Sequence, residues 1–352
     1  SKMQGLQEFY YLSLVPHVSG ICCILKFSHK FCNFLWQMTK VSVCIPTYNR
    51  ANLLHYAVNS VLNQTYNDFE LIITDDGSKD NTAEVVSQWN DSRIRYIRHL
   101  QNIGKSNNMR SGFDAATGEY FIKFDDDDGL TSDFLEKSIF ILDRNPSIDF
   151  VGTDHWVIDI NNQRDQKVSK LNSQKWGRTQ LSEGIVNNLL EIVFINQSFQ
   201  IGATLFRNRT LKEVGFMRPN IQNCEDNDLF VRLALAGKTG YYLPEKLMEY
   251  RFHAQQHGIN RAIPYLTDKL NYLQQFNFEL SKLESVRKSR LAETQLMLGL
   301  LLIETGQTQK GRQMVWEQKS FSPLRAWTGL ALSILPIEIR DQAFKFIRRL
   351  RS

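Results

Sequence analysis

Four consecutive aspartates, at positions 125–128, directly follow a largely apolar and aromatic run at residues 120–124. Two carboxylates about 4 Å apart repel each other by roughly 4 kcal/mol at an effective dielectric constant near 20, so four of them at the end of a buried strand favour a bound cation. Mg²⁺ and Mn²⁺ take oxygen ligands and commonly share them between protein carboxylates and substrate phosphates. The run therefore predicts either a metal–diphosphate site at a strand end or a solvated acidic loop, and the run alone does not decide between them.

The composition is that of an ordinary globular protein, with 352 residues of which 42% are hydrophobic and 22% charged. The net charge of +5 is too small to indicate a nucleic-acid partner by itself. The five cysteines show no metal-ligand spacing, so neither a zinc site nor a disulfide framework is predicted, and a reducing compartment fits best. We therefore expect a cytoplasmic protein.

The first 37 residues differ from the rest of the chain. Residues 10–27 are largely apolar, but Pro16, His17 and Lys26 interrupt them, and the stretch is short for a membrane span of about 20 apolar residues. No clear small-residue cleavage site marks a signal peptide. Because Met38 directly precedes a strong strand pattern, we expect residues 1–37 to be an extension without a folded role; a weak membrane-contacting segment is the alternative.

Strand and helix patterns alternate from residue 41 onward. Apolar, β-branched runs predict strands, and helical apolar spacing or a capping pair predicts helices between them. The strands are expected at residues 41–45, 69–74, 94–97 and 120–124, and the helices at 52–62, after Asn81 and within 102–116. This alternation predicts an α/β fold whose central sheet is mostly parallel and carries helices on both faces.

Polar clusters follow three of the predicted strands, at residues 46–50, 75–78 and 125–128. Ligands bind such sheets beyond the C-terminal ends of the strands, so these clusters predict a nucleotide site at one edge. The first strand is not followed by GxGxxG, and the sequence contains no GxxxxGK[ST]. Both a dinucleotide-binding Rossmann domain and a P-loop NTPase are therefore disfavoured.

The order and spacing of these segments resemble the family 2 glycosyltransferases. The resemblance covers residues 41 to about 255, and its blocks are Val-Ser-Val-Cys-Ile-Pro-Thr-Tyr-Asn-Arg at 41–50, Ser-Val-Leu-Asn-Gln-Thr-Tyr at 60–66, residues 69–78, residues 118–120 and a D-x-D-D motif at 125–128. It implies a GT-A fold and an inverting, metal-dependent hexosyltransferase. The implied donor is a nucleoside-diphosphate sugar, most simply a UDP-sugar. The implied acceptor is a saccharide or a lipid-linked saccharide, as in cell-surface polysaccharide or glycolipid synthesis.

The resemblance also assigns residues to the donor. Pro46 and Tyr48 match the loop that holds the base, and Asp76, with Asp75 beside it, matches the acid that hydrogen-bonds a uracil-type imide. The same Asp-Asp-Gly-Ser segment is also good turn and capping chemistry, which is the structural alternative. Asp125 matches the first acid of D-x-D, near the ribose.

The metal, Mg²⁺ or Mn²⁺, is implied at the same motif. Asp127 matches the metal ligand, with Asp125 and Asp128 flanking it, whereas Asp126 stands at the variable position and is predicted to have no role. A Tyr-Arg-x-His segment at residues 250–253 resembles one near the end of the family's catalytic domain, so His253 is a further candidate ligand; a purely structural histidine is the alternative.

Two parts of the donor site are less defined. The family's Ala-Arg-Asn block reads Asn-Met-Arg at residues 108–110, so either Lys105 or Arg110 is expected to supply positive charge to the diphosphate. The acceptor and linkage depend on residues 155–225, which carry no motif. There we expect a hairpin or loop at 161–170 and a strand within 196–206.

Glu225 and Asp226 match the family's E-D motif, whose aspartate is the general base that takes the proton of the acceptor hydroxyl. We expect Asp226 to be this base, with Glu225 next to it. Apolar spacing from Leu229 onward predicts a helix that starts at these acids. Stabilisation of a carboxylate at a helix N-terminus, by about 0.3–1 kcal/mol, is therefore the structural alternative.

The C-terminal part, residues 261–352, is helical by pattern and follows a predicted catalytic domain at 38–260. Residues 337–351 form a basic amphipathic helix, which predicts either contact with an anionic membrane surface, such as the inner face of the plasma membrane, or packing on the catalytic domain. Two other functions are compatible with a nucleotide site: a catalytically silent sugar-nucleotide-binding protein of the same fold, and a nucleotidyltransferase. The latter is disfavoured because no Gly- and Arg-rich loop follows the first strand.

Overall fold

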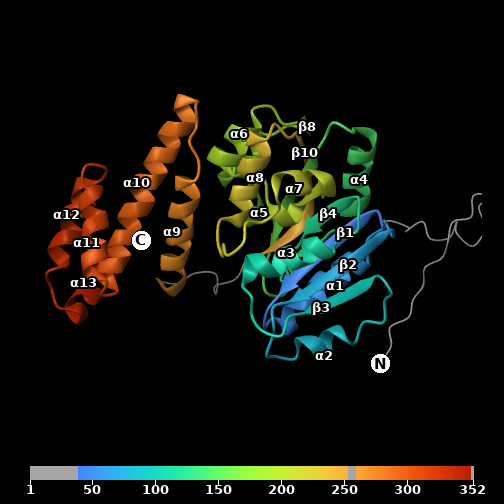
Figure 1. Cartoon of the computed structure of the whole chain (residues 1–352), viewed down its shortest axis with the longest axis horizontal. Helices are drawn as coiled ribbons and strands as arrows, with labels where there is room; N and C mark the ends of the chain where they lie inside the picture. Colours follow the sequence, from blue (N-terminus) through green and yellow to red (C-terminus); the bar gives the residue numbers. More distant parts are fainter. Residues whose placement is uncertain (1–38, 253–258, 350–352) are drawn as a thin grey trace, which may run out of the picture. The chain divides into compact units, whose positions relative to one another are not determined.

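The computed structural model describes residues 39–252 and 259–349 (Figure 1). The predicted extension at residues 1–37 and the candidate ligand His253 lie outside the described residues. Within the described part, no helix is long and apolar enough to cross a membrane.

The strands form one mixed sheet in the order β3-β2-β1-β4-β9-β6-β10-β5, with β7 paired to β6 and β8 to β10. The pairs β3-β2, β2-β1, β1-β4 and β6-β10 are parallel, whereas β9, β5, β7 and β8 join antiparallel. Their bounds are β1 (Val41–Thr47), β2 (Phe69–Asp75), β3 (Ile94–Arg98), β4 (Tyr120–Lys123), β5 (Gly129–Leu130), β6 (Phe150–Ile158), β7 (Arg164–Asp165), β8 (Gly184–Ile185), β9 (Thr204–Arg207) and β10 (Gly240–Arg251).

The helices of the α/β part connect or flank these strands, and α9 to α13 follow in the C-terminal part (Figure 1, orange to red). Their bounds are α1 (Ala51–Leu62), α2 (Thr82–Val86), α3 (Lys105–Ala115), α4 (Phe134–Arg144), α5 (Gln166–Lys175), η1 (Arg178–Gln180), α6 (Leu189–Glu191), η2 (Ile192–Asn196), η3 (Ile201–Ala203), α7 (Asn208–Val214), α8 (Glu225–Leu235), α9 (Ile259–Gln274), α10 (Ser281–Glu304), α11 (Thr308–Glu317), α12 (Pro323–Leu332) and α13 (Ile337–Arg349).

The predicted α/β architecture is confirmed, with helices on both faces of the sheet. Successive side chains of a strand point to opposite faces. Val43 and Ile45 of β1 belong to a hydrophobic cluster with α1 and α4, whereas Cys44 between them belongs to a second cluster with α3 and α8. The second cluster also contains Tyr272 and other apolar residues of α9 and α10, so the C-terminal helices share this core.

Three local predictions require correction. The capping residue before α2 is Asp80, whose carboxylate accepts from the Thr82 backbone N–H at 3.1 Å, and not Asn81, which makes no side-chain cap. Only Arg164–Asp165 of the expected 161–170 loop or hairpin pairs as a strand, and Asp165 then caps α5 by accepting from the Val168 N–H. The strand expected within 196–206 is limited to β9.

Helix α13 packs through Phe344 into a small cluster with α10, α11 and α12. The basic side of this helix differs from the prediction at Arg340, which is 6% exposed. Its guanidinium donates to the carbonyls of Ile303, Ser333 and Leu335. Helix C-termini leave such carbonyls without intrahelical partners, which explains why a charged side chain is buried at this position.

Candidate active site

A cavity of about 960 Å³ opens beyond the C-terminal ends of β1, β2 and β4. Seven of the residues predicted from the sequence line it: Pro46, Tyr48, Asp76, Lys105, Asp125, Asp127 and Asp226. The parallel register explains part of this convergence, because Thr47 of β1 pairs with Asp75 of β2 and Cys44 pairs with Lys123 of β4. The strands therefore bring the three polar clusters to one edge.

Asp75 and Asp76 have different surroundings, although both are buried. Asp75 accepts from the Ser78 N–H at 2.8 Å and from the Tyr96 hydroxyl at 2.5 Å, and it is not among the cavity-lining residues. Asp76 lines the cavity and accepts from the backbone N–H groups of Ile103 and Gly104, at 2.7 and 3.2 Å. Burial raises the pKa of Asp76, against the effect of these two bonds.

Asp126 and Asp127 share one cation, the guanidinium of Arg50. Its Nη1 lies 2.9 Å from Asp126 Oδ1 and 2.8 Å from Asp127 Oδ2. Burial raises the pKa of Asp126 to about 6, although Arg50 opposes this shift. The prediction that Asp126 has no role is therefore wrong in structural terms, because its buried carboxylate lines the cavity and holds Arg50. Arg50 stands in the first resembling block but was not singled out from the sequence.

Lys123 is a buried cation, at 1% exposure, and does not itself line the cavity. Its Nζ lies 2.7 Å from Asp125 Oδ1. Burial lowers the pKa of Lys123, but the charges of Asp125, Asp226 and Glu225 outweigh burial and hold this pKa well above its usual value. The same attraction, with Lys105, holds the pKa of Asp125 below its usual range despite burial. A lysine inside an apolar strand beside an acidic run was the sequence signal for this pair.

Asp226 and Glu225 form the first turn of α8 and lie near cations from two other elements. Glu225 is 3% exposed and pairs with Lys105 of α3. Burial raises the pKa of Asp226 to about 6, with a further increase from Glu225 and opposition from Lys123 and Lys105. Asp226 Oδ1 is buried and has no hydrogen-bond partner among the described residues. Arg110, the alternative to Lys105, donates to the Met217 carbonyl at 2.7 Å and does not line the cavity.

Asp128 lies behind the cavity and is not among its lining residues. Its Oδ1 accepts from the Arg251 backbone N–H at 2.8 Å, and its Oδ2 is buried without a hydrogen-bond partner among the described residues. Burial, together with Asp127 and Asp125, raises the pKa of Asp128. Arg251 also donates from Nε to the Asp127 carbonyl at 2.6 Å, so the Tyr-Arg-x-His segment contacts the aspartate run.

The donor atoms at this edge suit a hard cation, since Asp125, Asp126 and Asp127 all present carboxylates to the cavity. Among the described residues, however, no three His, Cys, Asp or Glu side chains are grouped as a metal site. Arg50 already pairs with two of the carboxylates, and its single charge leaves a net negative charge there. The residues therefore fit a cation that takes one or two protein carboxylates and completes its shell with water and substrate phosphate, as Mg²⁺ often does.

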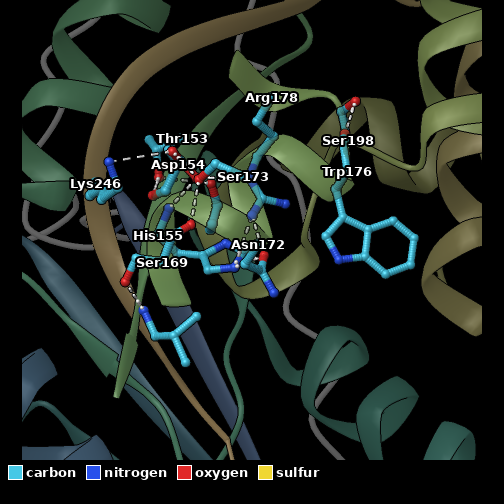
Figure 2. A network of polar contacts seen from close by, with 12 residues as sticks. Thr153, Asp154, His155, Ser169, Asn172, Ser173, Trp176, Arg178, Ser198 and Lys246 are labelled. Carbon is cyan, nitrogen blue, oxygen red and sulfur yellow. Dashed lines mark hydrogen bonds and ion pairs between the residues drawn. The ribbon is translucent and has the colours of Figure 1, made fainter. Parts of the chain in front are cut away.

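The other half of the cavity was not predicted from the sequence. It is lined by side chains from β6, α5, η1 and the segment before η3, namely His155, Asn172, Lys175, Trp176, Arg178, Gln197, Phe199 and Gln200. A buried polar network connects several of them (Figure 2): Arg178 Nε lies 2.7 Å from Asp154 Oδ1, and its Nη2 contacts His155 and Asn172. Burial, with the Arg178 charge, lowers the pKa of His155 to about 3, so His155 is neutral.

Comparison with known proteins places this site in a family. Residues 42–202 match the family described as Glycosyl transferase family 2. An uncharacterised glycosyltransferase of Nostoc sp., alr2836, is 30% identical over 226 residues, which cover 63% of this chain and 68% of that protein. The chain therefore belongs to the family 2 glycosyltransferases. The GalNAc(5)-diNAcBac-PP-undecaprenol beta-1,3-glucosyltransferase of Campylobacter jejuni is 44% identical over 102 residues, 28% of this chain and 33% of that enzyme. The chain thus matches between a third and about two thirds of the length of these relatives.

Solved structures agree with the GT-A fold. Residues 1–349 of S. aureus TarS in complex with UDP-GlcNAc give a TM-score of 0.58 at 16% identity, covering 87% of this chain and 91% of that one. The mannosyltransferase PcManGT of Pyrobaculum calidifontis, in complex with GDP-Man and Mn²⁺, gives a TM-score of 0.54 at 15% identity, covering 86% and 83%. At these identities the likeness concerns the fold alone.

The ion pair between Lys123 and Asp125 is expected to contribute to the stability of the fold. Replacement of Lys123 by Met removes the buried cation that pairs with the part-buried Asp125, so the free energy of unfolding should fall by about 3 kcal/mol at pH 7.5. Because the pKa of Asp125 is lowered in the fold, its contribution is present above the ordinary aspartate pKa and is lost as pH falls. Urea unfolding should therefore show a smaller deficit at pH 3, below the ordinary aspartate pKa of about 3.9.

The control is Lys170→Met, at an exposed position, which should change stability little at either pH. An equal deficit for Lys123→Met at both pH values would show that packing, and not charge pairing, accounts for its cost.

Proposed function

We propose that the protein transfers a hexose from a UDP-sugar to a hydroxyl of a saccharide acceptor with inversion, in the synthesis of a cell-surface polysaccharide or glycolipid. The observation that carries this proposal is the shared cavity, in which Asp226 faces the same space as the donor-side residues Tyr48, Asp76 and Asp125. The relatives support it: TarS was solved in complex with UDP-GlcNAc, and the Campylobacter enzyme is named a beta-1,3-glucosyltransferase. The proposal includes no nucleic-acid partner.

In this proposal the donor base lies against Pro46, Tyr48 and Asp76. Asp75 does not contact the donor in this proposal; its bonds to the Ser78 N–H and the Tyr96 hydroxyl fix the turn that positions Asp76. Lys105 supplies positive charge near the diphosphate, since it lines the cavity and Arg110 does not. Asp127, with Asp125, holds Mg²⁺ or Mn²⁺; when bound, this ion would neutralise charge on the diphosphate leaving group. Asp128 does not line the cavity and helps to position the aspartate run through its bond from the Arg251 N–H. His253 stays a sequence-based candidate ligand.

Asp226 is the proposed general base, with Glu225 holding Lys105 beside it. A base needs a pKa near the working pH and access to the acceptor proton. Asp226 meets both conditions, because its pKa is raised to about 6 and the residue lines the cavity. The carboxylate accepts the hydroxyl proton as the acceptor oxygen attacks the anomeric carbon and the bond to the diphosphate breaks. One displacement by one base inverts the anomeric centre.

Asp226→Asn should therefore abolish transfer from UDP-sugars while UDP binding persists, as measured by product analysis and calorimetry. In the unmodified enzyme kcat should rise about tenfold from pH 5 to pH 7, because the base must be ionised and its pKa is about 6. Asp114→Asn, at an exposed position, is the matched control. Retained transfer by Asp226→Asn would refute this assignment. Absence of transfer by the unmodified chain, with UDP binding intact, would favour the catalytically silent alternative.

The metal proposal has a separate test. UDP affinity, measured by calorimetry, should be at least about tenfold higher with Mn²⁺ than with EDTA, and Asp127→Asn should remove most of that difference. The Mn²⁺-bound PcManGT complex supports this expectation. Equal UDP affinities with Mn²⁺ and EDTA in the unmodified chain would contradict metal-dependent donor binding.

We also propose peripheral contact with an anionic membrane, at the cytoplasmic face, through α12 and α13. The undecaprenol-linked name of the Campylobacter relative supports a lipid-linked acceptor. Several apolar side chains of this region are exposed, including Leu324 on α12 at 75% and Ile334, between α12 and α13, at 77%. Arg325 lies on α12 and Lys345 on α13. Apolar and cationic side chains together favour binding at an anionic lipid interface.

The chain should sediment with phosphatidylglycerol-containing vesicles and less with phosphatidylcholine alone. The double variant Leu324→Asp, Ile334→Asp should reduce binding, whereas Leu100→Asp, at a fully exposed position after β3, should not. Unchanged sedimentation of the double variant would rule out α12 and the residues after it as the contact.

A further inference from the structure

A second hollow of about 330 Å³ adjoins the main cavity. The two share three lining residues, Lys175, Trp176 and Gln197. Trp176 therefore contributes to the walls of both. The smaller volume lies at the lower end of the range of about 300–1,000 Å³ that is typical of ligand sites.

The shared wall is held by bonds on both sides of Trp176 (Figure 2). The Trp176 carbonyl accepts from the Ser198 hydroxyl at 2.7 Å. Gly177, next to it, has φ = +68°, and a Cβ there would lie 3.1 Å from Asn196 Nδ2, so the turn requires glycine. Arg178 follows, with its guanidinium fixed on Asp154, His155 and Asn172. The indole is thus presented by a preorganised backbone.

Polar atoms on the main-cavity side of this wall lack protein partners. Arg178 uses Nε and Nη2 in the network, and its Nη1 makes no hydrogen bond within the described residues (Figure 2). Gln200 Oε1 and His155 Nδ1 are buried without hydrogen-bond partners in the same part of the chain. All three residues line the main cavity. Buried polar groups in native proteins are nearly always satisfied by protein or water, so this side of the cavity is suited to a polar ligand that contacts these groups directly or through water.

The second hollow has the composition of a site for a neutral polyhydroxyl compound. Four carboxamides line it, from Gln174, Gln180, Asn196 and Gln197, and no carboxylate stands among its described lining residues. Carboxamides both donate and accept, as sugar hydroxyls do. Two cations also line the hollow, Lys175 and Arg290. Arg290 is committed to the carbonyls of Phe194 and Ile195, at 2.5 and 2.8 Å, and Lys175 Nζ lies 5.1 Å from the centre of the Trp176 ring, so a neutral ligand is favoured over an anion. The Trp176 ring offers a flat apolar face for the C–H surface of a sugar.

We propose that the acceptor is an oligosaccharide of at least two units and that Trp176 separates the sites of two successive sugars. The accepting sugar lies in the main cavity and hydrogen-bonds Arg178 Nη1, and the preceding sugar lies in the second hollow against the carboxamides. This inference rests on the proposed function, because it concerns the acceptor half of the same cavity.

The test is a length series of acceptors on the full chain. Mono-, di- and trisaccharide glycosides of glucose, galactose and N-acetylglucosamine are titrated in the presence of UDP and Mn²⁺, with binding followed by saturation-transfer NMR. At least one series should bind about tenfold more tightly as the disaccharide than as the monosaccharide. Gln180→Ala, which alters the second hollow alone, should remove most of this gain without changing monosaccharide or UDP affinity. Trp176→Ala should remove most of it without changing UDP affinity. Trp176→Phe should restore part of it, and Gln313→Ala, an exposed glutamine on α11, should leave it unchanged.

Three outcomes would overturn the inference: equal affinity of monosaccharides and disaccharides in every series, a length gain that persists in both Trp176→Ala and Gln180→Ala, or no saccharide binding by a chain that binds UDP normally. Failure of the unmodified chain to bind UDP would instead refute the proposed function on which the inference rests.

Discussion

The buried ammonium group of Lys123 is the interaction on which the site depends. It stands at the end of β4, at 1% exposure, and faces Asp125 of the donor side and Asp226 with Glu225 of α8. Without a cation there, three carboxylates from two distant segments would repel one another in a poorly solvated space. The last residue of β4 thus supplies the charge that allows α8 to bring its own acids to the cavity, and the first acid of the aspartate run follows two residues later.

Two further cations form ion pairs with other carboxylates of the site. Arg50, at the start of α1, pairs with Asp126 and Asp127, and Lys105, at the start of α3, pairs with Glu225. Asp226 is the acid with a raised pKa and an unpartnered oxygen, whereas the pKa of Asp125 is lowered by its lysines. Carboxylates that line the same cavity therefore have environments suited to different tasks, one to remain charged and one to exchange a proton near neutral pH.

The sequence predicted the parts of this site that depend on strand ends. Apolar β-branched runs and the polar clusters after them predicted that Tyr48, Asp76 and Asp125 lie at one edge of the sheet. The prediction works because the carboxyl ends of neighbouring parallel strands lie at the same edge. The pattern of strands does not distinguish the adjacent Asp75 and Asp76, of which only Asp76 lines the cavity; the family resemblance was needed to assign the donor contact to Asp76. Asp126 was misjudged because its partner, Arg50, lies 76 residues earlier and the pairing depends on tertiary packing. Trp176 and Arg178 carried no motif, and their position follows from a long-range bond to Asp154 and a glycine turn.

The two halves of the cavity are consequently held in different ways. Donor-side residues follow from strands whose backbone pairing spans the core, so a change there disturbs the sheet as well as the ligand. Acceptor-side residues lie on short helices and turns between β6 and β9, held by side chains around one buried arginine. Lining residues such as Gln174 and Gln180 are exposed and contribute little to packing. Substitutions at those positions can alter the second hollow while the Asp154–Arg178 network and the sheet edge keep their geometry. The architecture therefore allows the proposed acceptor choice to vary independently of the proposed donor binding.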